Sequence, residues 1–186
     1  MKKKLYLIAG ANGSGKTTLA HELLREEKGL IFLNADETAA KTGDRTGLSS
    51  GKIILSEADR MLTSGKSFVM ESTISGNYHL RILSEAKSRG YETNLIYVFL
   101  DSVELNIARI KNRVLLGGHD VPEVDVIRRF RKSVKNFAVV AAVVDFWKLY
   151  YNGDDGYEQI AIGRGDDVEI LNDGLYQGFR IGLKNA

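Results

Sequence analysis

Short apolar runs alternate with amphipathic stretches over roughly the first 150 residues of the chain. Runs that are apolar along most of their length are typical of buried parallel strands, and they predict strands at 4–9, 30–33, 67–70, 92–100 and 146–152. Apolar residues at helical spacing predict helices at 17–27, 52–64, 79–87, 103–116 and 123–140. This alternation predicts an α/β fold, with a mainly parallel five-stranded sheet and helices on both of its faces.

The pattern changes after residue 152. A Gly- and Asp-rich turn leads into two strand-like segments, 157–162 and 168–171, which predict a C-terminal β-hairpin added antiparallel at the sheet edge. We treat 153–186 as this hairpin and a tail. Residues 38–50 are polar and contain two glycines, so they predict a loop or a frayed helix. A chain of 186 residues is long enough to bury a full core, and we expect one domain over 1–186.

The strongest local signal lies between the first predicted strand and the first predicted helix. It reads Gly10-Ala11-Asn12-Gly13-Ser14-Gly15-Lys16-Thr17 and fits G-x-x-x-x-G-K-[ST], the Walker A or P-loop pattern. Glycines let successive backbone N–H groups turn inward and cradle phosphates, and the following helix adds its positive N-terminal end. Lys16 is expected to reach the β- and γ-phosphates of ATP, and the Thr17 hydroxyl to bind Mg²⁺. The predicted nucleotide-binding set runs from Gly10 through Thr18.

Composition narrows the context of this site. The formal net charge is +2, which calls for neither a nucleic-acid partner nor a membrane surface. The chain has no cysteine, so disulfides, thiolate metal sites and cysteine nucleophiles are excluded. The basic start, Met1-Lys2-Lys3-Lys4, precedes an apolar run that is too short for a signal peptide. No apolar segment is long enough to span a bilayer, and we expect a cytoplasmic protein.

Carboxylates follow two of the predicted strands, at the sheet edge where open α/β folds bind ligands. Asp36 follows the second strand and could act as a general base, or it could cap a helix. Glu71 and Thr73 follow the third strand and share a side of an extended chain. They could bind substrate hydroxyls, Glu71 could stand in the Mg²⁺ shell, or both could belong to a polar turn.

A basic lid is predicted over 109–135, a stretch that contains eight basic and three acidic residues. Gly117-Gly118 supplies a hinge between two arginine-bearing helices, although a basic helix face can also be simply solvated. Forked guanidinium groups suit the charge of a transferring phosphoryl group. Arg113 is our first choice for this role, and we favour Arg128 as the second, leaving Arg129 for substrate binding. His119 could touch phosphate or substrate, or could be an exposed loop residue.

These parts favour a small-molecule kinase over other P-loop classes. The guanine-reading N-K-x-D of GTPases is missing from the sequence, and the chain is short for a motor ATPase. A kinase needs an acceptor base, acceptor-binding groups and a mobile lid that excludes water, and each has a candidate here. The alternatives are a kinase for a different acceptor, such as a nucleoside, sugar or antibiotic, and a nucleotide-binding switch without transferase activity.

Several segments together carry a family resemblance. They are Ile8 to Thr18, Phe32-Leu33-Asn34-Ala35-Asp36, Glu71-Ser72-Thr73-Ile74-Ser75-Gly76, Arg113-Val114 with Gly117-Gly118-His119-Asp120-Val121-Pro122-Glu123, and Ile127-Arg128-Arg129-Phe130. In this order they resemble the zeta toxin family of P-loop kinases. The 117–123 segment is more similar to the compact, chromosomally encoded relatives than to the plasmid toxins.

The resemblance implies an activity and a set of roles. Zeta toxins use ATP and Mg²⁺ to phosphorylate the 3′-hydroxyl of the N-acetylglucosamine moiety of UDP-N-acetylglucosamine, a nucleotide sugar. By resemblance, Asp36 would be the general base, and Glu71 with Thr73 would bind the sugar nucleotide. Arg113 and either Arg128 or Arg129 would stabilise the transferring phosphoryl group. A small helical antitoxin is the protein partner that the resemblance implies.

Overall fold

The central sheet has β1 (Lys4–Ala9) in its middle, paired in parallel with β3 (Phe68–Ser72) on one side and β4 (Glu92–Phe99) on the other. β2 (Ile31–Leu33) and β5 (Phe146–Gly153) extend the parallel part to the order β2-β3-β1-β4-β5. The computed structural model describes residues 2–35, 37–38, 48–165 and 167–185. The five predicted parallel strands are therefore confirmed, in an order in which every crossover carries a helix.

The C-terminal hairpin continues this sheet. β6 (Gly156–Arg164) pairs antiparallel with β5, and β7 (Asp167–Ile170) pairs antiparallel with β6. The described part of the chain therefore forms one seven-stranded sheet, in which five strands are parallel and the last two, β6 and β7, are antiparallel. The Trp147 ring lies where a side chain at Gly163 would stand, with a ring carbon 2.1 Å from the Cβ position. A glycine at this point lets Trp147 cover the neighbouring strand.

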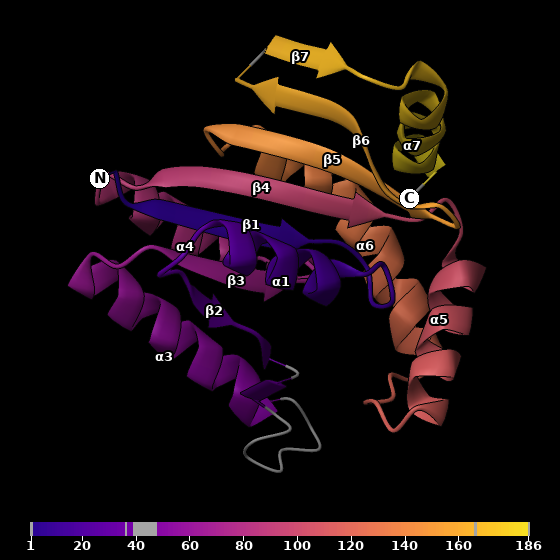
Figure 1. Ribbon diagram of the computed structural model, residues 1–186, viewed down its shortest axis with the longest axis horizontal. Coiled ribbons are helices and arrows are strands. Elements are labelled where there is room, and N and C mark those ends of the chain that lie inside the picture. Colours follow the sequence, from indigo (N-terminus) through magenta and orange to yellow (C-terminus); the bar gives the residue numbers. More distant parts are fainter. Residues whose placement is uncertain (1, 36, 39–47, 166, 186) are drawn as a thin grey trace.

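Helices cover both faces of the sheet, but unequally (Figure 1). Alternate residues of β1 point to opposite faces, as in any strand. Tyr6 and Ile8 pack against α1 (Lys16–Glu26), which lies in front of the sheet in Figure 1. Leu5 and Leu7 belong to the larger cluster, to which α3 (Leu48–Ser64), α4 (Tyr78–Ser88) and α6 (Glu123–Ala141) contribute their apolar faces. The apolar spacing in the sequence predicted all four helices.

α5 (Val103–Leu115) packs on α6 through a separate small cluster of Ile110, Val121 and Val126. The two helices and the 116–122 connection between them thus have their own apolar contact, apart from the main core. The loop predicted at 38–50 lies mostly outside the described residues, and the chain is already helical from Leu48, where α3 begins. In the part of the chain that the structure describes, no helix combines the length and the apolar character needed to cross a membrane.

The helix α7 (Asp173–Asn185) was not predicted from the sequence. Its glycines at 174, 178 and 182 each lower helix propensity by about 1 kcal/mol relative to alanine. Packing compensates for this cost. Phe179 is 3% exposed and lies against the rings of Tyr97, Phe99 and Phe137, with centroids 4.8 to 5.8 Å apart. The helix therefore depends on aromatic contacts with β4 and α6, which local periodicity does not reveal.

Candidate active site

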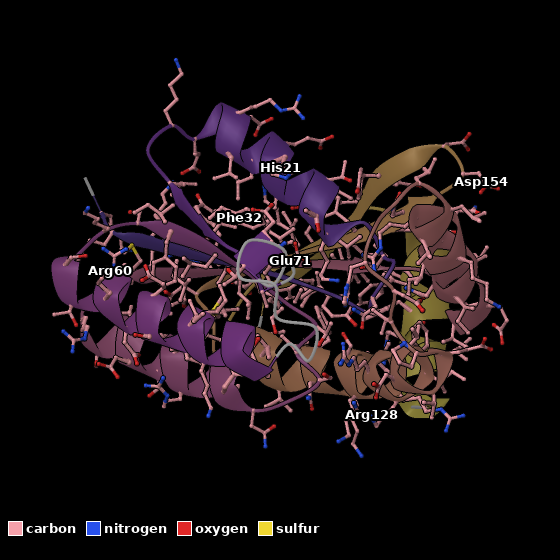
Figure 2. The ribbon with its side chains drawn as sticks, turned by 90° about the horizontal axis from the view of Figure 1, so that it is seen from below. His21, Phe32, Arg60, Glu71, Arg128 and Asp154 are labelled. Atoms are coloured by element: carbon pink, nitrogen blue, oxygen red, sulfur yellow. The ribbon has the colours of Figure 1, made fainter. Side chains whose placement is uncertain are left out.

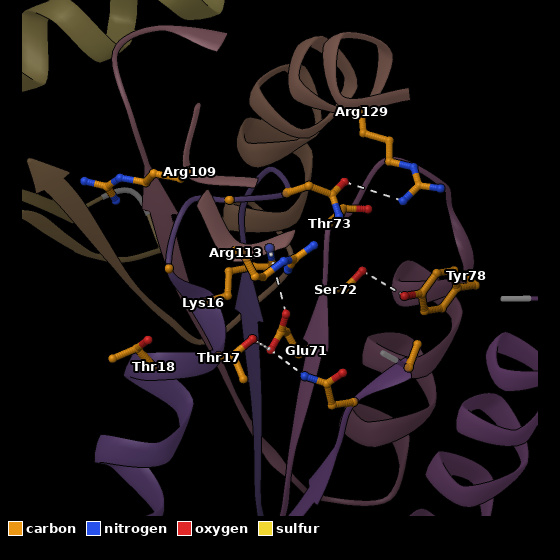
Figure 3. Close-up of a pocket in the computed structure, with 15 residues that line it drawn as sticks. Lys16, Thr17, Thr18, Glu71, Ser72, Thr73, Tyr78, Arg109, Arg113 and Arg129 are labelled. Atoms are coloured by element: carbon orange, nitrogen blue, oxygen red, sulfur yellow. Dashed lines mark hydrogen bonds and ion pairs between the residues drawn. The ribbon is translucent and has the colours of Figure 1, made fainter. Parts of the chain in front are cut away.

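A polar cavity of about 320 Å³ opens at the carboxyl ends of the parallel strands (Figure 3). Its lining comes from the P-loop, the ends of β2 and β3, and helices α5 and α6. The lining residues are Asn12, Gly13, Gly15, Lys16, Thr17, Thr18, Asn34, Ala35, Glu71, Ser72, Thr73, Tyr78, Arg109, Arg113 and Arg129. The cavity lies where open α/β sheets bind their ligands.

Glycine is needed at positions 13 and 15 of the P-loop, where the backbone is closely packed. Gly13 and Gly15 have φ angles of 80° and 99°, a backbone conformation that side chains disfavour. A Cβ at Gly13 would lie 2.6 Å from the Asn106 carbonyl oxygen, and one at Gly15 would lie 2.3 Å from Asn152 Nδ2. α1 begins directly after Gly15 without a side-chain cap. Its first N–H groups and positive dipole end are therefore suited to phosphate oxygens, which is a fit for ATP.

Side chains from α5, β5 and β6 hold the P-loop from behind. Asn106 Nδ2 donates to the Asn12 carbonyl at 2.7 Å, and Asn152 Nδ2 donates to the Ser14 carbonyl at 2.8 Å. The Tyr157 hydroxyl donates to the Gly15 carbonyl at 2.6 Å. These bonds fix the carbonyls of Asn12, Ser14 and Gly15, and within the loop the Ser14 N–H donates to the Ala11 carbonyl at 3.3 Å. Sequence reasoning missed all three residues, since they lie 94 to 142 positions from their partners.

Glu71 connects the P-loop to the ends of β2 and β3. Its Oε2 accepts hydrogen bonds from Thr17 Oγ1 and from Asn34 Nδ2, each at 2.8 Å, and its Oε1 lies 3.8 Å from Lys16 Nζ. Lys16 Nζ also donates to the Ala11 carbonyl at 2.8 Å. Figure 3 shows Lys16, Thr17 and Glu71 converging in the cavity. The carboxylate thus stands against the hydroxyl that the Walker A pattern assigns to Mg²⁺.

A Mg²⁺ site at this point would depend on the nucleotide. Among the residues that the structure describes, no group of three His, Cys, Asp or Glu side chains could hold a metal alone. Mg²⁺ is commonly bound by one or two protein oxygens together with substrate phosphates and waters. Thr17 Oγ1 and the Glu71 carboxylate fit that pattern. Sequence reasoning missed Asn34, which helps to orient the carboxylate.

The turn after β3 is tightly built. Ser72 Oγ accepts from the Ile74 N–H at 2.9 Å and lies 2.8 Å from the Tyr78 hydroxyl, and Thr73 Oγ1 lies 2.9 Å from Ser75 Oγ. Ile74 is fully buried with a φ of 45°, which is rare for a β-branched residue and costs about 1 to 3 kcal/mol. This geometry brings Thr73 to the cavity beside Glu71, as the spacing predicted.

Three arginines reach the cavity from α5 and α6. Arg109 Nη2 donates to the Asn152 carbonyl at 2.9 Å, and Arg113 Nη2 donates to the His119 carbonyl at 2.6 Å. Arg129 Nη1 lies 3.5 Å from Asn12 Oδ1 on the P-loop. Arg113 and Arg129 thus lie where the sequence expected phosphoryl-stabilising or substrate-binding groups, and Arg109 joins them.

Other candidates lie elsewhere. Arg128 does not line the cavity. It pairs with Asp125 at 2.7 Å, and Figure 2 shows it at the margin of the molecule while Glu71 lies near the middle. α6 turns the neighbouring Arg129 inward instead, because consecutive helical residues point about 100° apart. The His119 side chain is exposed, and Asp36 lies outside the described residues. Gly10, Ala11 and Ser14 belong to the loop without lining the cavity.

The first strand of the parallel sheet leads through a glycine-rich loop into α1, and a Lys-Thr pair lies at the cavity. This arrangement defines a P-loop protein of the kinase-like type. The comparisons with known proteins are more specific. Residues 1–161 match the family model described as zeta toxin, and the chain belongs to this family. An uncharacterized protein of Haemophilus influenzae is 31% identical over 132 residues, which cover 69% of this chain and 92% of that protein.

Solved structures show the same fold at low identity. A crystal structure of the AvrRxo1-ORF1:ORF2 complex with ATP matches with a TM-score of 0.76 and 18% identity. The match covers 96% of this chain and 63% of that one, so our chain spans less than two thirds of that relative. A chain from the PezAT chromosomal toxin-antitoxin system of Streptococcus pneumoniae matches with a TM-score of 0.66 and 17% identity, over 98% of this chain and 85% of that one.

Proposed function

We propose that the chain is an ATP-dependent kinase that transfers the γ-phosphoryl group to a hydroxyl of a small molecule, namely a nucleotide sugar such as UDP-N-acetylglucosamine. The observation that carries the proposal is the convergence of the P-loop, the Glu71–Thr17 contact and three arginines on one cavity. Membership of the zeta toxin family supports the kinase class, and the family resemblance supports the nucleotide sugar.

The nucleotide end of the reaction follows from the P-loop. Its N–H groups and Lys16 would hold the β- and γ-phosphates of ATP. Bound Mg²⁺ would supply positive charge to the phosphate oxygens. Thr17 would ligate the ion, and Glu71 would stand in its shell, because the carboxylate contacts the Thr17 hydroxyl directly. This contact favours the metal-shell role of Glu71 over substrate binding.

The acceptor end is proposed from the β3–α4 turn and from Asp36. Thr73 would bind the acceptor, and Asp36 would take the proton of the attacking hydroxyl. The preceding residues Asn34 and Ala35 line the cavity, which supports this role. The acceptor oxygen forms a bond to the γ-phosphorus while the bond to the β–γ bridging oxygen breaks, and ADP leaves. Arg113 and Arg129 would stabilise the charge spread over the transferring group.

The first test is mass spectrometry of the products formed from ATP, Mg²⁺ and UDP-N-acetylglucosamine, with Lys16→Ala as the control. We expect a product heavier by one phosphate that the control lacks. ATP hydrolysis without a modified sugar nucleotide would reject this acceptor and lead to a panel of nucleosides, sugars and antibiotics. In Asp36→Asn we expect turnover to fall by about a thousandfold with ATP binding preserved, and unchanged turnover would reject Asp36 as the base.

A protein antitoxin is the proposed partner. The PezAT relative is described as part of a chromosomal toxin-antitoxin system, and our chain shares its fold. We also propose a cytoplasmic site of action, where ATP and nucleotide sugars are available. The chain has no cysteine and therefore no disulfide that the reducing cytoplasm could break. Expression with and without the neighbouring small open reading frames tests the partner, and growth arrest relieved by one of them is the expected result.

A further inference from the structure

A second hollow, also of about 320 Å³, lies next to the proposed active site. It is formed by the β3–α4 turn and by residues 131–136 of α6. Its lining residues are Ser75, Asn77, Arg131, Lys132, Lys135 and Asn136. Of these six side chains three are cationic and none is acidic, so the part of the lining that the structure describes is electropositive.

The three cations have no counter-charge within the described residues. Arg131, Lys132 and Lys135 are exposed, and none of them makes an ion pair or a hydrogen bond in that part of the chain. Other basic residues of α6 differ in this respect. Arg128 pairs with Asp125, and Arg129 lies against Asn12. Three unpaired cations around one hollow form a site for an anion, whose charge-assisted hydrogen bonds are stronger than neutral ones.

Two elements, α6 and the β3–α4 turn, contribute residues both to the hollow and to the cavity. On α6, Arg129 lines the cavity, while Lys132 and Asn136 line the hollow, and the spacing i, i+3, i+7 places all three on one helix face. One step of three residues is a rise of about 4.5 Å. On the β3–α4 turn, Thr73 lines the cavity and its hydroxyl bonds Ser75, which lines the hollow.

The turn between the two spaces is fixed in place. Asn136 Nδ2 donates to the Ile74 carbonyl at 2.7 Å, so α6 holds the turn at this point. Asn77 precedes α4 and makes no side-chain capping hydrogen bond, and its carbonyl accepts from the Leu80 N–H at 3.1 Å, so the positive end of the α4 dipole lies beside the three cations. Both walls of the hollow are therefore preformed and electropositive.

We infer that this hollow binds the phosphate or diphosphate group of the acceptor. The inference rests on the proposed function, and it makes the acceptor a phosphorylated molecule whose hydroxyl end lies at Thr73 while its anionic part lies against Arg131, Lys132 and Lys135. The ATP phosphates do not compete for this place, because the P-loop that would hold them lines the cavity and contributes no residue to the hollow. The cations of α6 that line the hollow thus select acceptors by charge.

A charge-matched pair of variants tests the inference by kinetics. Lys132→Gln with Lys135→Gln removes two cations from the hollow, and Lys28→Gln with Lys148→Gln removes two exposed cations elsewhere. We expect the first variant to raise KM for UDP-N-acetylglucosamine by about tenfold or more, with KM for ATP and kcat within about twofold. The activity towards N-acetylglucosamine, which lacks the diphosphate, should be equal in both variants. Equal KM values for UDP-N-acetylglucosamine would overturn the inference.

A binding measurement tests the hollow even if no acceptor is phosphorylated. Inorganic pyrophosphate is titrated calorimetrically into protein whose P-loop is saturated with Mg²⁺ and a non-hydrolysable ATP analogue. We expect the wild type and the Lys28/Lys148 control to bind pyrophosphate, and the Lys132/Lys135 variant to bind it at least tenfold more weakly. Absence of binding in the wild type, or equal weakening in both variants, would reject the anion site independently of the kinase activity. Pyrophosphate binding with an unchanged KM would reject the acceptor assignment.

Discussion

The P-loop wall of the cavity, residues 12–18, and the opposite wall, formed by Thr73, Tyr78 and Arg129, are built from different groups. The P-loop wall presents backbone N–H groups, and its carbonyls are held by Asn106, Asn152 and Tyr157. The opposite wall presents side chains on a turn that α6 supports through Asn136. We therefore expect substitutions behind the P-loop wall to change ATP affinity, and substitutions on the opposite wall to change turnover or acceptor choice.

The largest effect is expected for Arg129→Ala. Removing a guanidinium that neutralises the transferring phosphoryl group should lower kcat by about a thousandfold, with less than about a threefold change in KM for ATP. Arg128→Ala is the matched control, because Arg128 is adjacent in sequence but is exposed and pairs with Asp125. We expect its kcat to stay within about threefold of the wild type. Equal losses in both variants, measured by steady-state kinetics, would remove Arg129 from the active site.

Arg128 and Arg129 also show what could not be predicted from the sequence. The basic stretch predicted that α6 carries an active-site arginine, but the choice between adjacent arginines depends on how the whole helix is rotated. That rotation is set by Val134, Phe137 and Val140, which pack into the main core. From the sequence alone we favour Arg128, whereas in the structure Arg129 lines the cavity. The P-loop itself could be predicted, because the spacing of its glycines, lysine and threonine is a local sequence motif.

The groups behind the P-loop lacked any such local signal. Asn152 and Tyr157 flank the β5–β6 turn, which the sequence predicted only as a connection to a hairpin. They reach the P-loop because β5 runs parallel to β1 two strands away and ends at the same edge of the sheet. Sequence periodicity predicts strands, and the alternation of elements predicts a parallel sheet. Strand order decides which strand ends become neighbours, and the sequence did not predict that order.

Glu71→Gln tests the region between the two walls. The amide keeps the size of the side chain but loses the negative charge beside Thr17 and Lys16. We expect kcat at physiological Mg²⁺ to fall by about a hundredfold, and the Mg²⁺ concentration for half-maximal rate to rise by about tenfold. KM for the acceptor should change by less than about threefold. An increase in acceptor KM at an unchanged Mg²⁺ requirement would instead make Glu71 a substrate ligand.

His79 makes the opposite wall sensitive to acid. This residue is 1% exposed beside Tyr78, and burial lowers its pKa to about 4 from 6.5. Within the described part of the chain neither ring nitrogen has a hydrogen-bond partner. The unfolded chain takes up a proton near pH 6.5 and the folded chain only near pH 4. The contribution of neutral His79 to the free energy of unfolding is therefore fully present above pH 6.5. It is lost as the pH drops towards 4, and the loss is at most about 3 kcal/mol.

Urea unfolding at pH 7 and pH 4.5 measures this contribution. His79→Leu cannot take up the proton, so we expect its free energy of unfolding to fall less between the two pH values than that of the wild type. The difference between the two proteins isolates His79 from the other groups that titrate in acid. Identical pH dependences would mean that His79 is already protonated in the fold, or that it is exposed in solution.

The smallest effect, and the finest test of the P-loop wall, is expected for Tyr157→Phe. The substitution removes one hydrogen bond to the Gly15 carbonyl and leaves the ring in place. A net loss of about 1 kcal/mol would weaken ATP binding by about fivefold, with kcat unchanged, because this hydroxyl orients the loop without touching the acceptor. Tyr150→Phe is the matched control, since its hydroxyl bonds Gln159 at 2.7 Å, remote from the P-loop.

Calorimetric titration of both variants with an ATP analogue separates local from general effects. If the Tyr157 hydroxyl positions the loop, ATP affinity falls in Tyr157→Phe and stays within about twofold of the wild type in Tyr150→Phe. Equal weakening would mean that both substitutions merely loosen the β5–β6 pair. Unchanged affinity in both would mean that Asn106 and Asn152 hold the loop without help, since each still donates to a P-loop carbonyl. The bracing of the P-loop would then be redundant rather than additive.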